Sequence, residues 1–409
     1  RARNIAAHTI ATMTIRVLIV DDEAFLADAI ATGLSRAGKT VFITALVHGL
    51  TRGGRFPVFE AYASGRIARA YLAPQPDDAV PRFAYENHVR TLVEERLWPS
   101  STTDISELRL VIEYQRQNGA DRTLTLDIVD YPGEWLLDLP LLSKSYEQWS
   151  AESLALSREP LRAKLAAPWH AHLATLKPEA REDEQAALTE ARLFTDYLRA
   201  CRDERFAMSL LPPGRFLMPG ELEGSPALTF TPLPDDWRGS ALWREFERRF
   251  GAYKSRVVRP FFRDHFARID RQVVLMDVLG AIHAGPQAVE DMRRAMADIL
   301  SAFRPGRAGW LSQLLGARRV ERILFAATKA DHLHHQSHDR LEAVLRRIVA
   351  RAAARAEYAG AEIDVVALAA VRATREAQVQ RGRDRLPSIL GTPAPGEVAN
   401  GETLDGETE

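Results

Sequence analysis

The chain has 409 residues, 46% of them hydrophobic, and a formal net charge of −1 at pH 7. This length predicts two compact units, and the near-neutral charge argues against a nucleic acid or an anionic membrane as the main partner. The single cysteine, Cys201, excludes an intramolecular disulfide and a thiolate-rich zinc site. No apolar run reaches the ~18 residues that span a bilayer, and residues 1–12 lack a signal-peptide core, so we expect a cytoplasmic protein.

The first strand of the chain has two possible positions. Residues 13–23 (MTIRVLIVDDE) look like the opening strand and acid pair of a response-regulator receiver domain. A receiver needs about a hundred further residues, but a glycine-rich loop begins at Gly33, so we do not expect a receiver. The strand before that loop is either residues 25–32, a poor strand because it contains Asp28, or residues 15–20, which leave the loop unusually distant.

Residues 33–40 (GLSRAGKT) match the phosphate-binding pattern G-x-x-x-x-G-K-[ST] without a mismatch. The glycines let successive N–H groups converge on phosphate, Lys39 can reach the β- and γ-phosphates, and Thr40 offers a hydroxyl to Mg²⁺. The expected nucleotide contacts are Ser35, Arg36, Ala37, Gly38, Lys39, Thr40 and Val41. Arg36 is either a phosphate contact, an arginine finger supplied in cis, or a solvated loop-tip side chain.

Lysine usage supports a special role for this loop. Only six of the 54 basic residues are lysines, and the other 48 are arginines. Lys39 and Lys329 are the two lysines that fall in motifs requiring a compact ammonium group.

The segment around Trp98 has the character of a first switch, because it precedes a strand beginning near Ile105. We expect Trp98, Ser101, Thr102 and Thr103 to approach the nucleotide, with Thr102 binding Mg²⁺. A buried core position is the alternative for Trp98.

A buried strand, residues 124–130, ends in Asp130 and begins the motif D-x-x-G. Asp130 can hold the Mg²⁺ shell, and Gly133 can offer its N–H to the γ-phosphate. Glu134 occupies the position where many GTPases have a water-orienting Gln. Its carboxylate could position water, or it could repel the γ-phosphate.

Residues 141–268 are mostly helical by pattern, with a proline-rich loop around 211–236. A strand at 272–278, a helix near 285–303 and a strand ending in T-K-A-D (328–331) follow. The Asp331 carboxylate can accept both the N1–H and the exocyclic amine of guanine, and Lys329 can lie along the base. The nearby histidines 332, 334, 335 and 338 match no zinc spacing, so surface or hydrogen-bonding roles are predicted, with His332 close to the base.

Several of these segments together resemble the YcjX-like family of bacterial stress-associated GTPases, over roughly residues 31–395. They are GLSRAGKTVFITALVHGL, WPSSTTDISELRL, LDIVDYPGEWLLDLPLL, VVLMDVLGAIHAGP, LFAATKADHLHH and ALAAVRATRE. The resemblance implies a GTP-binding G domain interrupted by a helical insertion, Mg²⁺ dependence, a cytoplasmic location and a link to stress. It also adds Ala370 and Val371 to the nucleotide-binding residues.

The sequence therefore predicts an α/β P-loop NTPase with a mostly parallel sheet. The predicted parts are a G domain at 14–140 and 269–390, a helical insertion at 141–268, and a disordered tail at 391–409. Lys39, Thr102 and Glu134 are the expected catalytic residues, and Thr40, Thr102 and Asp130 the expected metal ligands. GTP hydrolysis with GTP/GDP and Mg²⁺ is favoured, with an ATPase or a scaffold without turnover as alternatives, and an unknown protein effector contacting the insertion.

Overall fold

The protein is described from a computed structural model. The described residues are 12–21, 38–52, 64–100, 102–116, 119–178, 184–203, 205–265, 269–302, 322–358, 360–392, 398–399 and 402–403. Most of the predicted phosphate-binding loop and the alternative first strand at 25–32 lie outside them.

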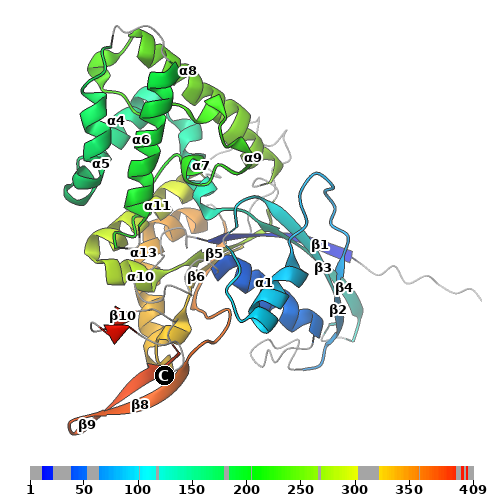
Figure 1. The fold of residues 1–409 in the computed structure, drawn as a ribbon. Helices are drawn as coiled ribbons and strands as arrows, with labels where there is room; N and C mark the ends of the chain where they lie inside the picture. Colours follow the sequence, from blue (N-terminus) through cyan, green and yellow to red (C-terminus); the bar gives the residue numbers. More distant parts are fainter. Residues whose placement is uncertain are drawn as a thin grey trace, which may run out of the picture.

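A seven-stranded sheet forms the centre of the fold, in the order β2-β3-β4-β1-β5-β6-β7 (Figure 1). The strands are β1 (Thr12–Asp21), β2 (Ile67–Ala73), β3 (Ser106–Gln115), β4 (Asp121–Asp130), β5 (Arg271–Met276), β6 (Arg322–Ala327) and β7 (Glu362–Ala367). Strands β4, β1, β5, β6 and β7 pair in parallel, whereas β2 and β3 pair antiparallel with their neighbours. The predicted α/β fold with a mostly parallel sheet is confirmed at this level.

Among the described residues, the first strand of the sheet is β1, which includes the predicted segment 15–20. The run from Ile15 to Val20 is rich in β-branched residues, which favour an extended chain. It pairs with β4 and with β5, so residues 12–21 occupy the centre of the sheet. Residues 22–37 separate this strand from the helix that carries Lys39.

Helices cover both faces of the sheet. Successive side chains of a strand point to opposite faces, so neighbouring residues pack against different helices. Ile128 packs with helix α1 (Gly38–Arg52), while the next residue, Val129, belongs to the core on the other face. That other face is covered by α10 (Val278–Ala284), α11 (Pro286–Ala302) and α13 (His338–Tyr358). Helix α3 (Tyr85–Arg90) and the π-helical turn η2 (Thr91–Glu95) lie beside α1.

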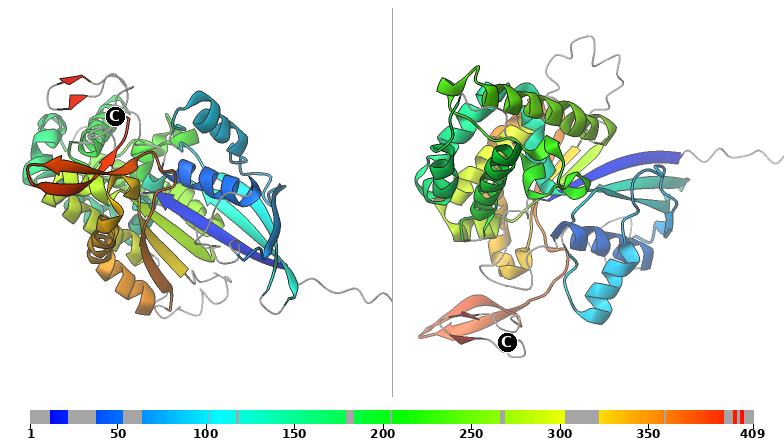
Figure 2. Two further views of the ribbon diagram at one scale, coloured as in Figure 1. Left: turned by 90° about the horizontal axis from the view of Figure 1, so that it is seen from below. Right: turned by 45° about the horizontal axis from the view of Figure 1, so that its top comes forward.

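The part of the chain that follows β4 and precedes β5 in sequence forms a group of helices above the sheet, drawn in green in Figures 1 and 2. Its elements are the 3₁₀ segment η3 (Gly133–Ser143), α4 (Tyr146–Ser157), α5 (Pro160–Leu173), α6 (Glu184–Arg202), α7 (Gly214–Leu217), α8 (Ala241–Tyr253), the π-helical turn η7 (Lys254–Val258) and α9 (Arg259–Asp264). Between α7 and α8 lie three short 3₁₀ turns, η4 (Gly220–Leu222), η5 (Pro226–Leu228) and η6 (Asp235–Trp237). We call residues 133–264 the helical region.

Aromatic side chains fill the centre of the helical region. Trp149 stacks on Phe250 with ring centroids 5.2 Å apart, and Trp169 stacks on Tyr197 at 5.6 Å. Ser145 begins α4 with a capping box, in which its hydroxyl accepts the Gln148 N–H and the Gln148 side chain returns the contact. These aromatic residues belong to the same continuous core that lies under α11 and α13.

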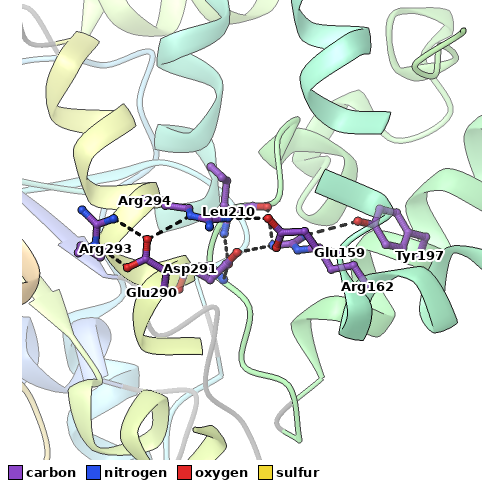
Figure 3. A network of polar contacts seen from close by, with 9 residues as sticks. Glu159, Arg162, Tyr197, Leu210, Glu290, Asp291, Arg293 and Arg294 are labelled. Carbon is purple, nitrogen blue, oxygen red and sulfur yellow. Dashed lines mark hydrogen bonds and ion pairs between the residues drawn. The ribbon is translucent and has the colours of Figure 1, made fainter. Parts of the chain in front are cut away.

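A buried ion pair joins the helical region to α11, as Figure 3 shows. Arg162 of α5 and Asp291 of α11 are 1% and 5% exposed, and their charged atoms lie 2.7 Å apart. The Asp291 carboxylate also accepts the backbone N–H groups of Ser209 and Leu210. Because these bonds satisfy both oxygens, they fix α5 and the chain after α6 on the sheet-covering helix.

Two small hairpins complete the described chain. Strands β8 (Arg375–Arg381) and β9 (Asp384–Leu390) pair as an arm that projects from the sheet (Figures 1 and 2). Between β6 and α13 lie the short 3₁₀ turns η9 (Ala330–His332) and η10 (His335–Ser337). Within the predicted tail, β10 (Val398–Ala399) pairs with β11 (Glu402–Thr403), and residues 393–397, 400–401 and 404–409 lie outside the described residues.

Candidate functional site

The candidate site lies where the parallel strands end. Strand β4 ends at Asp130, β5 is followed by Asp277, β6 by Thr328 and β7 by Leu368. Carboxyl ends of parallel strands meet at one edge of a sheet, and ligands of open α/β sheets bind at that edge. Helix α1 begins at Gly38 next to this edge, so its positive end adds to the same location.

Four side chains from three segments form a buried polar cluster. Lys39 Nζ lies 3.1 Å from Asp130 Oδ1 and donates to the Tyr131 carbonyl. Thr102 Oγ1 donates to Asp130 Oδ2 at 2.9 Å and lies 3.2 Å from Thr40 Oγ1. Lys39, Thr40 and Asp130 are each at most 3% exposed. The residues predicted for phosphate and metal are therefore neighbours, although 28 to 92 positions separate the contacting partners in sequence.

The donor set of this cluster suits Mg²⁺. Two hydroxyls, Thr40 and Thr102, and one carboxylate, Asp130, face one another, and all three supply oxygen. Mg²⁺ prefers oxygen ligands and usually keeps several waters beside one or two protein carboxylates and substrate phosphates. These three residues would hold such an ion, with Lys39 beside it.

A hollow opens next to this cluster, at the start of α1. It is lined by Gly38, Val41, Phe42, Trp98, Leu275, Thr328, Lys329, Asp331, His332, Leu368, Ala369, Ala370, Val371 and Ala373. Its lining is largely apolar and includes the polar side chains of Thr328, Lys329, Asp331 and His332, which is typical of a small-molecule site. Trp98 lines this hollow and is only partly buried, so the fully buried alternative for Trp98 is wrong.

Hydrogen bonds hold the Asp331 side chain in place. Its Oδ2 accepts the Ala373 N–H at 2.9 Å, and its backbone carbonyl accepts from the Thr374 hydroxyl. Asp331 is 9% exposed, so its carboxylate is largely shielded from water and is oriented before any ligand arrives. This contact joins the segment after β6 to the segment after β7.

Lys329 is held in an unusual backbone conformation. Its φ of 58° lies in the left-handed region, which is uncommon for a residue with a side chain and often marks functional sites. Its ammonium forms an ion pair with the buried Asp277, which caps α10 by accepting the Gly280 N–H at 2.9 Å. Lys329 lines the hollow, and its ammonium pairs with Asp277, the residue that follows β5.

Glu134, near the start of the helical region, forms an ion pair with helix α6. Its Oε1 lies 2.7 Å from Arg202 Nη2 of α6, and the residue is 3% exposed. The neighbouring Trp135 donates its indole N–H to the Met218 carbonyl at 2.9 Å and carries the Arg215 guanidinium on its ring. Only glycine fits at 214, because an added Cβ would lie 1.7 Å from the Glu134 carbonyl oxygen. The segment after D-x-x-G is thus embedded in the helical region.

Burial shifts the pKa values of His88 and Asp138. Partial burial lowers the pKa of His88 on α3, and the negative charge of Asp130 acts in the opposite direction. Burial raises the pKa of Asp138 in η3 to about 6, although Tyr253, Gly214 and Arg215 donate hydrogen bonds that favour its ionised form. Asp138 is therefore a carboxyl group whose charge changes in mildly acidic solution.

The structure brings most predicted residues to two adjoining places. The polar cluster contains Lys39, Thr40, Thr102 and Asp130, and the hollow contains Gly38, Val41, Trp98, Lys329, Asp331, His332, Ala370 and Val371. Gly133 is buried at the start of η3, and Thr103 is exposed. The predicted contacts Ser35, Arg36, Ala37 and Ser101 lie outside the described residues.

Sequence reasoning missed several residues of the site. Thr328 belongs to the T-K-A-D motif and Asp277 follows an apolar strand, so both carried a signal. Phe42, Leu275 and Leu368 are apolar residues of ordinary elements and carried none. Arg202 could not have been found, because its partner Glu134 is 68 positions earlier in the chain.

Comparisons with known proteins give a consistent result. A family described as "YcjX-like family, DUF463" matches residues 29–406, so β1 lies before the matched part. A protein of Escherichia coli named Ras-like GTPase YcjX is 36% identical over 396 residues, covering 90% of this chain and 84% of that protein. A protein of the same name from Shewanella oneidensis is 34% identical over 397 residues, covering 90% and 81%. Among the described helices, none combines the length and the apolar character needed to span a membrane.

Proposed function

This chain belongs to the YcjX-like family, and we propose that it binds GTP and hydrolyses its β–γ phosphoanhydride at the carboxyl edge of the sheet. The relatives named Ras-like GTPase support an activity of this type. We call the cluster of Lys39, Thr40, Thr102 and Asp130 the phosphate end of the site. The hollow lined by Lys329 and Asp331 is its base end.

One observation carries the proposal. The cluster of Lys39, Thr40, Thr102 and Asp130 adjoins a hollow that Lys329 and Asp331 line. Gly38 belongs to the hollow and Lys39 follows it directly, so one extended ligand can reach both. A charged phosphate group with a polar aromatic base fits that combination.

At the phosphate end, the proposed roles follow from charge and hydrogen bonding. Lys39 binds β- and γ-phosphate oxygens and stabilises negative charge that develops during transfer. Thr40, Thr102 and Asp130 would hold the metal ion beside the phosphates. Mg²⁺, when bound, neutralises charge on the β- and γ-phosphate oxygens.

At the base end, Asp331 selects guanine. A carboxylate can accept two hydrogen bonds from guanine, at N1–H and at the exocyclic amine, and adenine offers no such pair. The Ala373 N–H orients the carboxylate, so little ordering remains when the base binds. Val41, Trp98, Ala370 and Val371 supply the apolar contacts around the base.

A scaffold with negligible turnover is the second candidate. The observation that favours it is the ion pair of Glu134 with Arg202, which occupies the side chain proposed to orient water. In this case the protein binds GTP and changes its contacts without fast hydrolysis. An ATPase is the third candidate and requires that Asp331 does not reach the base.

Calorimetric titration with GTP, GDP and ATP in Mg²⁺, together with a phosphate-release assay, tests the proposal. We expect GTP and GDP to bind and ATP to bind at least tenfold more weakly, with phosphate release from GTP. Binding without phosphate release would favour the scaffold. Equal binding of GTP and ATP would favour the ATPase.

Asp331→Asn tests the base end separately. An amide donates where a carboxylate oxygen accepts, so the variant should bind GTP at least tenfold more weakly and gain affinity for xanthosine triphosphate, which has an oxygen in place of the amine. Competition between the two nucleotides measures the change. Unchanged GTP affinity in the variant would remove the guanine assignment.

The remaining expectations belong to this proposal. The division into a G domain, 14–140 and 269–390, and a helical insertion, 141–268, is proposed on the pattern of elements between β4 and β5. A role as a stress-associated switch, a cytoplasmic location and an effector that contacts the helical region are proposed from the family resemblance.

A further inference from the structure

Two histidines and a glutamate converge beside the loop that carries Asp331. His334 and His335 lie at the start of η10, and Glu376 lies on β8, 41 positions later. His335 Nδ1 is 2.8 Å from Glu376 Oε2, and His334 Nε2 is 3.8 Å from the same oxygen. One ligand atom from each of the three residues lies within 4.8 Å of the others.

The distances between the Glu376 oxygen and the two histidine nitrogens are close to those between neighbouring ligand atoms around a tetrahedral metal ion. Zn²⁺ binds histidine nitrogen and carboxylate oxygen at about 2.0–2.2 Å, so neighbouring ligand atoms of a tetrahedral site lie about 3.3 Å apart. The separations of 2.8 and 3.8 Å fall on either side of that value. The third separation, between the two histidine nitrogens, is at most 4.8 Å, so rotation of the exposed His335 side chain would bring the three ligand atoms toward this spacing.

The second oxygen of Glu376 is held by other groups. Its Oε1 accepts the His335 backbone N–H at 2.9 Å and lies 3.5 Å from Arg372 Nη2. Outer contacts of this kind orient a ligating carboxylate and are a regular part of metal sites. The Arg372 charge lowers the affinity for a cation, but it faces Oε1 while Oε2 faces the two imidazoles.

Exposure leaves room for a water ligand. The side chains of His334 and Glu376 are 11% and 27% exposed, whereas that of His335 is 61% exposed. Three protein ligands with one open position is the arrangement of zinc sites that also bind water. Ligation through His334 Nε2 requires the proton on Nδ1 and gives up the long 3.4 Å contact with the Gln336 N–H.

We propose that His334, His335 and Glu376 bind a divalent cation of the zinc type, with water as the fourth ligand. The ion links the segment after β6 to the base of the β8–β9 arm. Asp331 already contacts Ala373 and Thr374 across the same junction, so the metal stabilises the connection that orients the guanine-selecting carboxylate. The site does not depend on GTP binding for its formation.

Titration of untagged, nucleotide-free protein with ZnCl₂, followed by calorimetry, tests this site. The expected result is saturable binding of one Zn²⁺ per chain, weakened at least tenfold by His335→Ala and by Glu376→Gln. The control is His283→Ala, because His283 is an exposed histidine on α10 outside the cluster. This variant should bind Zn²⁺ with the parent affinity.

Absence of saturable binding, or equal affinity in the parent and both variants, would overturn the proposal. Thermal melting and GDP titration of each variant show whether the fold and the nucleotide site are intact, which separates this proposal from the proposed GTPase function. A second measurement uses the parent alone with Co²⁺. A tetrahedral Co²⁺ spectrum in visible light supports the site, and the pale spectrum of six-coordinate Co²⁺ contradicts it.

Discussion

Lys39 combines two roles, because it pairs with Asp130 and is also expected to bind phosphate. The ammonium lies 3.1 Å from Asp130 Oδ1 in surroundings where both residues are at most 3% exposed. The cluster is therefore preorganised for a charged ligand.

Lys39→Ala should weaken GTP binding about tenfold to a hundredfold, because one charge-assisted contact of roughly 1.5–3 kcal/mol is lost. Titration with a non-hydrolysable GTP analogue measures the affinity. Lys144→Ala is the matched control, since Lys144 pairs with Glu152 on the surface of the helical region and should leave binding unchanged. Parent affinity in Lys39→Ala, with a normal melting curve, would refute the phosphate-site assignment.

Helix α11 connects the sheet to the helical region through a buried charge. Arg162 and Asp291 lie 2.7 Å apart. Burial lowers the pKa of the Arg162 guanidinium, but the negative charge of Asp291 acts in the opposite direction, and the pKa stays above its ordinary value. The outward neighbour Glu290 pairs with Arg293 and Arg294 on the surface of the same helix (Figure 3). Glu290 and Asp291 are consecutive residues of the same helix, but only Asp291 is buried, so substitutions at the two positions can be compared directly.

Asp291→Ala should lower the free energy of unfolding by roughly 3–5 kcal/mol, because it leaves the Arg162 charge buried without its partner. Glu290→Ala should cost less than about 1 kcal/mol, because its ion pairs are exposed. Urea unfolding measures both values. A loss of similar size in the two variants would mean that the buried pair does not hold the helical region in place.

Segment η3 follows the D-x-x-G motif directly and is the element through which a bound nucleotide could act on helices α6 and α7. Residues Gly133 to Leu141 are buried, and Glu134 and Trp135 contact α6, α7 and the chain that follows α7. A change at Gly133 must therefore move or loosen these contacts, because packed interfaces are not continuously deformable.

Hydrogen exchange at residues 130–150 should be faster with GDP than with a non-hydrolysable GTP analogue, because loss of the γ-phosphate removes hydrogen bonds from this segment. Residues 214–218 should follow, since they pack on Glu134 and Trp135. In Arg202→Ala the response at α6 should shrink, while that at residues 130–133 remains. Identical protection in both nucleotide states would favour a static scaffold.

At the level of the whole chain, one core extends from the sheet through α11 and α13 into the helical region. Asp138 lies within that core and is 2% exposed. Its folded pKa of about 6 is above the ordinary value of 3.8, so the folded state binds more protons than the unfolded state between these values. The contribution of this group to stability is present below pH ~4 and is lost as the pH rises through about 6.

Asp138→Asn should therefore gain stability relative to the parent as the pH rises from ~4 to ~6, by at most about 3 kcal/mol. The asparagine does not titrate, so the difference between the two proteins isolates this carboxyl group. Urea unfolding at several pH values measures it. A difference that is constant across this range would mean that Asp138 is ionised in the folded protein with its ordinary pKa.

Local patterns were sufficient for several elements of the fold and for part of the site. Apolar runs and the acids that follow them predicted β4, β5 and β6 with Asp130 and Asp331, because such runs and the residues after them are properties of adjacent positions. Lys39, Thr40 and Asp331 were found because their motifs are contiguous.

Contacts between distant segments required the tertiary structure. Arg202 on Glu134, Arg162 on Asp291 and Glu376 on His334 and His335 join positions 41 to 129 apart, and no periodicity encodes such pairs. The histidine run illustrates the reason: its spacing fitted no metal motif, because the carboxylate that completes the cluster comes from β8. The sequence by itself determined where several of the strands and helices form and which segments carry the phosphate and base motifs. Packing alone decided which charges meet, because side-chain burial depends on how the elements are brought together.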